Sequence, residues 1–392
     1  MIRVSLPLPV SLAASLFPHT LWVLSCLATA ATEPTPAEPV KPAAPLAAPA
    51  PSAALRLAKL KDKYGDRMLY EVDDKLRILF VMGTDQRSLG EVKQRLTAHA
   101  VALQHDLFKH GIKDYLAVIV PRKWANPKVT GHFYPDLVDA ATIGSNLMHE
   151  FTHALHYADQ VGRGEYQPVW IMEGLASLYE ESAVVDGHAV PTVNHRLLKL
   201  QEEVKNKHYL PFAKMMKLER RQFTSHQYAQ ARYMCMYFHA TGQLPQWYAT
   251  YTAGFAADAS GIAATEHVYG KPLGEVEQDW VAWLLKQVPP RLVVGPGAAG
   301  LGIGTQQLPD AVEITQLAPQ QAADLAGLVV GDAVIRVDGE RMIEMESLGL
   351  ALARHRVGDA VKLEYRRHGE YRETTATLTA LPAASPPAKQ PL

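Results

Sequence analysis

His149-Glu150-Phe151-Thr152-His153 lies within the stretch Gly-Ser-Asn-Leu-Met-His-Glu-Phe-Thr-His-Ala-Leu-His at residues 144–156. On a helix, side chains four residues apart share one face, so the imidazoles of His149 and His153 can converge on one metal ion. Glu150 lies beside them as a candidate base. For a chain with 16 His and 40 acidic residues, the expected number of chance matches to this pattern is on the order of 0.03. The alternative is an exposed helix that carries two histidines by coincidence.

A metal site on this helix requires an apolar wall and a third ligand. Four apolar residues supply the wall: Leu147, Met148, Phe151 and Leu155. A second helix-like stretch follows at residues 170–180, and Glu173 within it is the natural third ligand. Three protein ligands and a water form a catalytic zinc site, whereas a structural site is closed by a fourth side chain. A cysteine-based structural site is excluded because the chain has only Cys26 and Cys235.

The pairing of His-Glu-x-x-His with Trp-x-x-Glu-Gly-x-Ala at residues 170–176 resembles the gluzincin metallopeptidases, especially the bacterial peptidase MA-like domains. The resemblance implies a zincin-like fold and a Zn²⁺ ion bound by His149, His153 and Glu173. It also implies that Glu150 is the catalytic acid/base.

One position departs from the thermolysin-like pattern. Those enzymes have an Asp four residues after the ligand Glu, where it orients a zinc-bound His, and this chain has Ser177. Glu180, two helical turns beyond Glu173 and on its face, is the candidate replacement in the second shell.

An oxyanion partner is expected on the helix at residues 224–241. Tyr228 begins a Tyr-Ala-Gln pattern that similar domains carry on the helix closing the active site, where a phenolic O–H can stabilise an oxyanion. The alternative is that Tyr228 is a core residue, as we predict for Tyr233 and Tyr237. His226 is a second candidate for the same role.

Length, charge and missing motifs narrow the function classes. A chain of 392 residues with 48% hydrophobic and 20% charged side chains can bury a sizeable core and should hold two or three domains. Its net charge of -1 gives no electrostatic reason to expect nucleic acid or an anionic membrane surface as a partner. The sequence has neither Gly-x-Ser-x-Gly nor Gly-x-x-x-x-Gly-Lys-Ser/Thr, which argues against that type of serine hydrolase and against nucleotide hydrolysis.

The N-terminus predicts export. Residues 1–31 have the weakly basic start, short apolar run and small-x-small site of a signal peptide, and the run is too short for a transmembrane span. Alternatively, Val-Leu-Ser-Cys at 23–26 resembles a lipobox and predicts a lipid anchor at Cys26. Residues 32–54 read as a Pro/Ala-rich linker. The expected location is the periplasm or cell envelope of a bacterium, and Cys235 is then an unpaired core residue.

Residues 55–290 are predicted to form one zincin-like catalytic domain, a small sheet followed by a helical subdomain. Predicted strands are 75–82, 115–120, 129–134 and 137–143, and predicted helices are 89–110, 190–207, 224–241 and 273–287. The strand edge at 129–143 is the candidate for holding an extended substrate by main-chain hydrogen bonds. We interpret His132 on this ribbon as a surface histidine and not as a ligand.

After a linker at 291–299, alternating apolar strands appear between glycine turns. Strands are predicted at 311–315, 333–337, 361–366 and 374–378, with a helix at 346–355. The order and spacing of Gly-Leu-Gly-Ile-Gly at 300–304, Ala-Ala-Asp-Leu-Ala-Gly-Leu at 322–328, Gly-Asp at 331–332 and Asp-Gly at 338–339 resemble a bacterial PDZ domain of envelope proteases, spanning 300–380.

That resemblance implies a site for a peptide C-terminus. In such domains the loop formed here by Leu301, Gly302, Ile303 and Gly304 offers backbone N–H groups to a terminal carboxylate, and the next strand pairs with the peptide. The alternative is a packing module with a closed groove. Residues 381–392 are predicted to be a disordered tail.

The sequence therefore predicts an α+β protein, with a zincin-like metallopeptidase domain followed by a β-rich PDZ domain. The predicted function is an exported zinc-dependent peptidase whose PDZ domain recruits or positions a peptide or protein substrate. Two alternatives remain open: a catalytically silent envelope scaffold that binds through the PDZ domain, and a zinc amidohydrolase acting on non-peptide amides.

Overall fold

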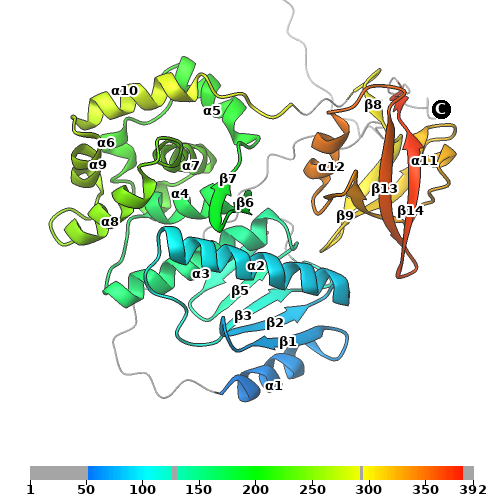
Figure 1. The fold of residues 1–392 in the computed structure, drawn as a ribbon, viewed down its shortest axis with the longest axis horizontal. Coiled ribbons are helices and arrows are strands. Elements are labelled where there is room, and N and C mark those ends of the chain that lie inside the picture. The colour runs from blue at the N-terminus through cyan, green and yellow to red at the C-terminus, as the bar shows by residue number, and fades with distance from the viewer. Residues whose placement is uncertain (1–51, 126–129, 292–294, 383–392) are drawn as a thin grey trace, which may run out of the picture.

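The computed structural model describes residues 52–125, 130–291 and 295–382 in two bodies, a mixed helix-and-sheet N-terminal body and a β-rich C-terminal body (Figure 1). The predicted α+β class is confirmed. The predicted signal peptide, the lipid-anchor residue Cys26 and nearly all of the predicted linker and tail lie outside the described residues. In the described ranges no helix combines the length and apolar character that a membrane crossing requires.

The N-terminal body is built on a five-stranded sheet in the order β1-β2-β3-β5-β4. The strands are β1 (Leu69–Asp73), β2 (Ile78–Met82), β3 (Leu116–Val120), β4 (Gly131–Tyr134) and β5 (Leu137–Ala140). The three central strands are parallel, and the edge strands β1 and β4 run antiparallel to their neighbours. Every residue of β2 and β3 is buried, which explains their uninterrupted apolar sequences.

Helices cover both faces of this sheet. Helix α1 (Ala53–Tyr64) packs on one face with the side chains of Val81, Ala117 and Ile119. Helices α2 (Gln86–Asp106) and α3 (Ser145–Arg163) cover the other face, where Phe80, Val118 and other alternate residues join the main core. Successive side chains of a strand point to opposite faces, so one apolar run serves two cores.

A helical subdomain completes the N-terminal body. Its elements are α4 (Val169–Tyr179), β6 (Ser182–Val185), β7 (His188–Pro191), α5 (Arg196–Lys205), α6 (Phe212–Met215), the 3₁₀ helix η1 (Arg220–Gln222), α7 (Ser225–Ala240), α8 (Leu244–Gly254), α9 (Ile262–Tyr269) and α10 (Leu273–Leu284). Helices α4 and α7 pack closely because Gly174 has no side chain: a Cβ there would lie 2.8 Å from the Sγ of Cys235. The thiol of Cys235 is free and buried, as predicted.

Several predicted boundaries differ from the structure: the helix predicted at 89–110 ends at Asp106, the strand predicted at 75–82 begins at Ile78, and two helix starts differ for identifiable reasons. The helix predicted at 190–207 begins at Arg196, because residues 188–191 pair with β6 in a hairpin. The helix predicted to start at Leu89 begins at Gln86, where the carboxylate of Asp85 caps it by accepting a hydrogen bond from the N–H of Ser88 at 2.8 Å.

The C-terminal body contains a six-stranded sheet with β9 at one edge. Its elements are β8 (Ala299–Gly300), β9 (Ile303–Gln307), β10 (Val312–Leu317), α11 (Ala322–Leu325), β11 (Ala333–Val337), β12 (Glu340–Arg341), α12 (Met345–Leu352), β13 (Ala360–Arg367), β14 (Glu370–Thr377) and β15 (Thr379–Ala380). Helix α12 lies beside β9 (Figure 1). Apolar side chains from both sheet and helices fill a separate core.

The two bodies meet at the N-terminal ends of α2 and α3. The hydroxyl of Ser88 donates to the carboxylate of Asp310 at 2.8 Å, and the N–H of Ile143 donates to the carbonyl of Pro309 at 2.8 Å. Arg341 adds an ion pair to Glu91 at 2.9 Å. The C-terminal body therefore contacts the start of the helix that carries His149 and His153.

Candidate metal centre

Three predicted ligands converge between α3 and α4. His149 and His153 lie one helical turn apart on α3, and their Nε2 atoms are 3.1 Å from each other. Glu173 on α4 places its Oε2 3.4 Å from the Nε2 of His149 and 3.3 Å from that of His153. All three side chains are largely withdrawn from solvent. One ion could contact all three atoms after small adjustments.

The two oxygens of Glu173 have different partners. Oε1 is paired with the guanidinium of Arg220, while Oε2 is buried and accepts no hydrogen bond within the described part of the chain. A buried carboxylate oxygen without a donor is costly, and a cation between it and two imidazole nitrogens removes that cost. Two nitrogens and one carboxylate oxygen are also the donor set of an open catalytic zinc site. The residues present therefore fit a zinc ion.

Glu180 orients His149. Its Oε2 lies 3.1 Å from the Nδ1 of His149, so the remaining nitrogen, Nε2, faces Glu173. The carboxylate is held by Arg196 at 3.2 Å and Asn194 at 3.3 Å. Burial alone would raise the pKa of Glu180, but the arginines and His149 outweigh it and lower the pKa to about 2. An ionised carboxylate behind a ligand histidine fixes its tautomer and raises its basicity.

Ser177 takes no part in this arrangement. Its hydroxyl is buried and has no hydrogen-bond partner among the described residues. The structure therefore places the carboxylate behind His149 at the position that the sequence favoured, seven residues beyond Glu173 and at the end of α4.

Glu150 lies beside the ligands and against the edge strand β4. Its side chain is 6% exposed. Burial raises its pKa to about 7, with further contributions from Glu173 and Asp139 and an opposing one from His149. Gly131 makes the approach possible, since a Cβ there would lie 2.8 Å from the Cγ of Glu150. The candidate base thus faces the first residue of β4, whose outer edge pairs with no other strand among the described residues.

The tyrosines predicted on α7 are all buried. All three belong to the main hydrophobic core, as predicted for Tyr233 and Tyr237 and as the alternative for Tyr228 proposed. Tyr228 is 3% exposed and packs edge-on against Phe223 with ring centroids 5.1 Å apart. Burial lowers the pKa of the Arg220 guanidinium, but Glu173 and, to a smaller extent, Tyr228 raise it above its usual value. Tyr228 is therefore a core residue that influences Arg220, the partner of Glu173, electrostatically.

The two other histidines considered in the sequence lie in different settings. His226 is half exposed and pairs with Glu203. His132 on β4 contacts the carboxylate of Asp139 at 2.7 Å. Neither belongs to the group formed by His149, His153 and Glu173.

Sequence reasoning missed Arg220 and Gly131. Arg220 lies in η1, 47 residues after Glu173, and no local pattern marks it among the basic residues of that region. A glycine on an expected edge strand was a usable signal, because glycine in a strand indicates a close approach of another group.

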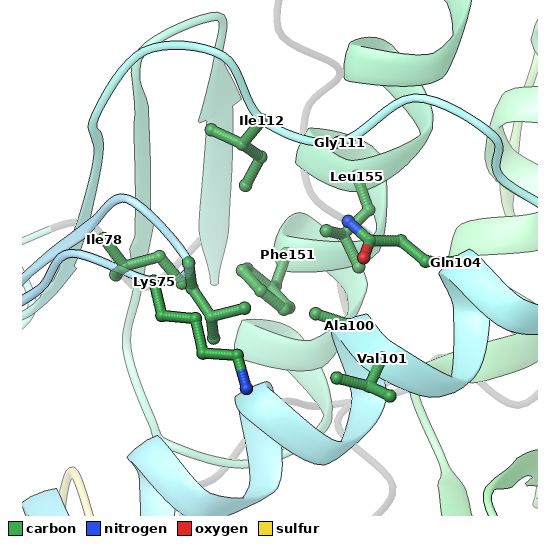
Figure 2. Close-up of a pocket in the computed structure, with 10 residues that line it drawn as sticks. Lys75, Ile78, Ala100, Val101, Gln104, Gly111, Ile112, Phe151 and Leu155 are labelled. Carbon is green, nitrogen blue, oxygen red and sulfur yellow. The ribbon is translucent and has the colours of Figure 1, made fainter.

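A pocket of about 250 Å³ lies between α2, α3 and the start of β2 (Figure 2). Phe151 and Leu155 of α3 line it together with Ile78, Ala100 and Ile112. Phe151 and Leu155 fall on the side of α3 that packs on the sheet, whereas His149 and His153 face α4. The pocket is therefore separate from the ligand set.

The C-terminal body presents the predicted peptide loop at the start of β9. Leu301 and Ile303 are buried, and Gly302 has φ of 72°. A side chain at Gly302 would be strained there and would collide with Gln321. The loop therefore leads directly into the edge strand β9.

In a comparison with known families, residues 299–378 match the PDZ domain. The C-terminal body is therefore a PDZ domain. A comparison with curated protein sequences finds no significant match.

Solved structures give weak similarities. An aminopeptidase N family protein from Idiomarina loihiensis is 14% identical, with a TM-score of 0.35 over 81% of this chain and 68% of that one. An HtrA-type protease AlgW variant with a decapeptide is 21% identical over 24% of this chain, with a TM-score of 0.21. This chain spans 31% of the length of that protease. The HtrA3 PDZ domain bound to a phage-derived ligand is 16% identical, with a TM-score of 0.20 over 21% of this chain and 86% of that one. Scores this low carry no weight for function.

Proposed function

We propose that this protein is an exported zinc-dependent peptidase of the gluzincin type, with Zn²⁺ held by His149, His153 and Glu173. The observation that carries the proposal is the buried Oε2 of Glu173, which faces two imidazole nitrogens and accepts no hydrogen bond in the described part of the chain. Arg220 occupies the other oxygen, which leaves one carboxylate oxygen for the ion.

Zinc, when bound, acts as a Lewis acid and lowers the pKa of a water toward about 7. Glu150 is the residue that accepts the proton of the attacking water and returns it to the leaving amine. Its buried carboxyl, with a pKa raised to about 7, is suited to both transfers near neutral pH.

The substrate would lie along β4. This strand is at the sheet edge, and its first residue, Gly131, touches Glu150. An extended peptide can pair with such an edge through main-chain hydrogen bonds, which aligns the scissile carbonyl with the base. Tyr228, which borders Arg220, is the candidate donor to the developing oxyanion.

The PDZ domain would recruit or position the substrate. Its strand β9 follows a loop that requires glycine, and the outer edge of β9 pairs with no other strand in the part of the chain that the structure describes. This is the arrangement that binds peptide C-termini by strand addition. Export to the periplasm or cell envelope belongs to the same proposal, and rests on the sequence of residues 1–31.

The proposal is tested with the full chain, its zinc content measured, on a panel of peptides and small amides. Glu150→Gln should retain one zinc at this site while peptide hydrolysis falls by several orders of magnitude. Full activity of that variant would overturn the proposal. Absence of bound zinc would favour the scaffold, and hydrolysis of small amides alone would favour an amidohydrolase.

A further inference from the structure

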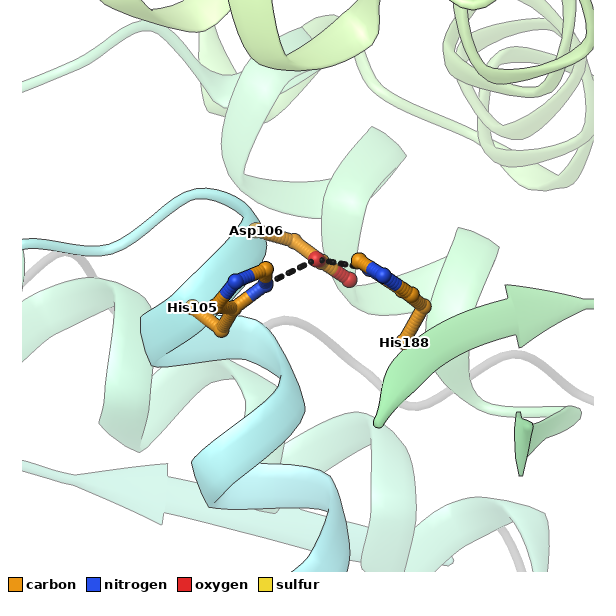
Figure 3. Close-up of side chains that lie close together, drawn as sticks. All are labelled: His105, Asp106 and His188. Atoms are coloured by element: carbon orange, nitrogen blue, oxygen red, sulfur yellow. Dashed lines mark hydrogen bonds and ion pairs between the residues drawn. The ribbon is translucent and has the colours of Figure 1, made fainter. Parts of the chain in front are cut away.

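A second group of metal-ligating side chains lies on the surface, at the end of α2. The surface cluster consists of His105, Asp106 and His188 (Figure 3). The Nδ1 atoms of His105 and His188 lie 3.0 and 2.7 Å from the same oxygen of Asp106, Oδ1. All three candidate ligand atoms lie within 4.8 Å of one another.

Both elements that carry the surface cluster are well fixed. His105 and Asp106 are the last two residues of α2. His188 begins β7, directly after a hairpin turn in which Asp186 and Gly187 have φ of 50° and 85°. Such Asp-Gly turns match the twist of the paired strands, so the hairpin presents His188 in a defined direction.

Asp106 is held by the backbone as well as by the histidines. Its other oxygen, Oδ2, accepts a hydrogen bond from the N–H of Ala189 at 3.0 Å. The carboxylate is 14% exposed, whereas His105 and His188 are 67% and 57% exposed. The surface cluster thus has an anchored central ligand and two outer ligands open to solvent.

We propose that the surface cluster binds a divalent transition-metal ion, with the Nδ1 atoms of His105 and His188 and Oδ1 of Asp106 as ligands. Donors that share a tetrahedral zinc ion at about 2.0–2.2 Å lie roughly 3.3 Å apart. The Nδ1 atoms of His105 and His188 lie 3.0 and 2.7 Å from Oδ1 of Asp106, so the two exposed imidazoles would move outward to admit the ion. Two imidazoles and one carboxylate favour Zn²⁺, Ni²⁺ or Cu²⁺ over Mg²⁺ or Ca²⁺. The partial negative charge at the C-terminus of α2 also favours a cation at this position.

The ion would clip the β6–β7 hairpin to α2. This hairpin begins at Ser182, two residues after Glu180, the residue that orients His149. The bound ion takes the place of the imidazole protons that now point at Asp106, and water completes its coordination. The ion would therefore join the hairpin to α2, at a position distinct from the ligand set between α3 and α4.

The test is a Zn²⁺ titration of the full chain, followed by equilibrium dialysis and metal analysis. The double variant His105→Asn/His188→Asn should bind one ion per chain fewer than the wild type. Either single substitution should lower the affinity for that ion by at least about tenfold. His208→Asn, another exposed histidine, is the matched control and should change nothing. Because each count is compared with the wild type, the result does not depend on whether the His149 site binds zinc.

A spectroscopic arm identifies the ligands. The electron paramagnetic resonance spectrum of the Cu²⁺-loaded wild type minus that of His188→Asn should show coupling to two nitrogens, because the ligand set of His149 and His153 is common to both proteins and cancels. Equal ion counts in the wild type and the double variant would overturn the proposal, as would a second ion whose affinity responds to His208→Asn instead.

Discussion

Glu344 of the PDZ domain accepts hydrogen bonds from both the N–H and the hydroxyl of Ser145, at 2.8 and 2.7 Å. Ser145 is the first residue of α3, the helix of His149 and His153. The N-cap residue, Gly144, has no side chain of its own, and a Cβ there would collide with Glu344. Glu344 is also the N-cap residue of its own helix, α12, where its backbone N–H donates to the hydroxyl of Ser347 at 3.2 Å. The metal helix is thus capped by a residue about 200 positions away.

Glu344→Ala should destabilise the protein and loosen the metal helix. Loss of an N-cap costs about 1 kcal/mol in the free energy of unfolding, and here the carboxylate accepts two hydrogen bonds from Ser145. We expect a loss of about 1–2 kcal/mol in chemical denaturation, together with weaker zinc binding. Glu364→Ala is the control, because Glu364 pairs with Arg87 across the same interface without touching α3. Equal losses of zinc affinity in both variants would show that the cap is not specific.

Glu180→Gln should weaken zinc binding by about 10–100-fold, the usual effect of removing a group that orients a metal ligand. The substitution keeps the volume of the side chain but removes the charge that lies 3.1 Å from the Nδ1 of His149. Competition with a chromophoric chelator measures the affinity. Glu181→Gln is the matched control, since Glu181 contacts Asn194 and not His149. A normal affinity in Glu180→Gln would remove Glu180 from the site.

Arg220→Gln tests the residue that sequence reasoning missed. Arg220 holds Oε1 of Glu173 and leaves Oε2 for the ion, so without it the carboxylate can turn away from the histidines. We expect faster zinc dissociation and a zinc affinity lower by about tenfold or more. Arg221→Gln, at a neighbouring exposed position that pairs only with Glu219 in the described contacts, should leave both unchanged. An unaltered dissociation rate in Arg220→Gln would assign Arg220 a packing role instead.

Periodicity and apolar runs were sufficient for much of the fold. His149 and His153 share a helix face at any helical register, and the central strands β2 and β3 are continuous apolar runs in the sequence. Glu173 followed from its motif, and Glu180 from its position on the same helix face. These are local relationships, and local sequence carries them.

Contacts between distant segments were out of reach. Arg220 meets Glu173, and Glu344 meets Ser145, only because tertiary packing brings together segments that are far apart in the chain. The hairpin β6–β7 was missed because its strands are four residues long and mostly exposed. Burial alternates along β7, but the sequence does not reveal it because the exposed Val190 is as apolar as the buried Ala189. His188 was therefore not connected with His105.

Gly174→Ala should displace Glu173 by forcing α4 away from α7. A Cβ at Gly174 would lie 2.8 Å from the Sγ of Cys235 and 3.1 Å from the carbonyl oxygen of Ala231, so α4 must move away from α7 and carry Glu173 with it. Overpacking of this kind costs about 1–3 kcal/mol. The midpoint temperature of thermal denaturation and the affinity for zinc should both fall. Gly254→Ala, at the end of α8 with open space around it, should be neutral or slightly stabilising because alanine favours helix. If Gly174→Ala lowers stability but leaves zinc affinity intact, the position of Glu173 does not depend on the contact between α4 and α7.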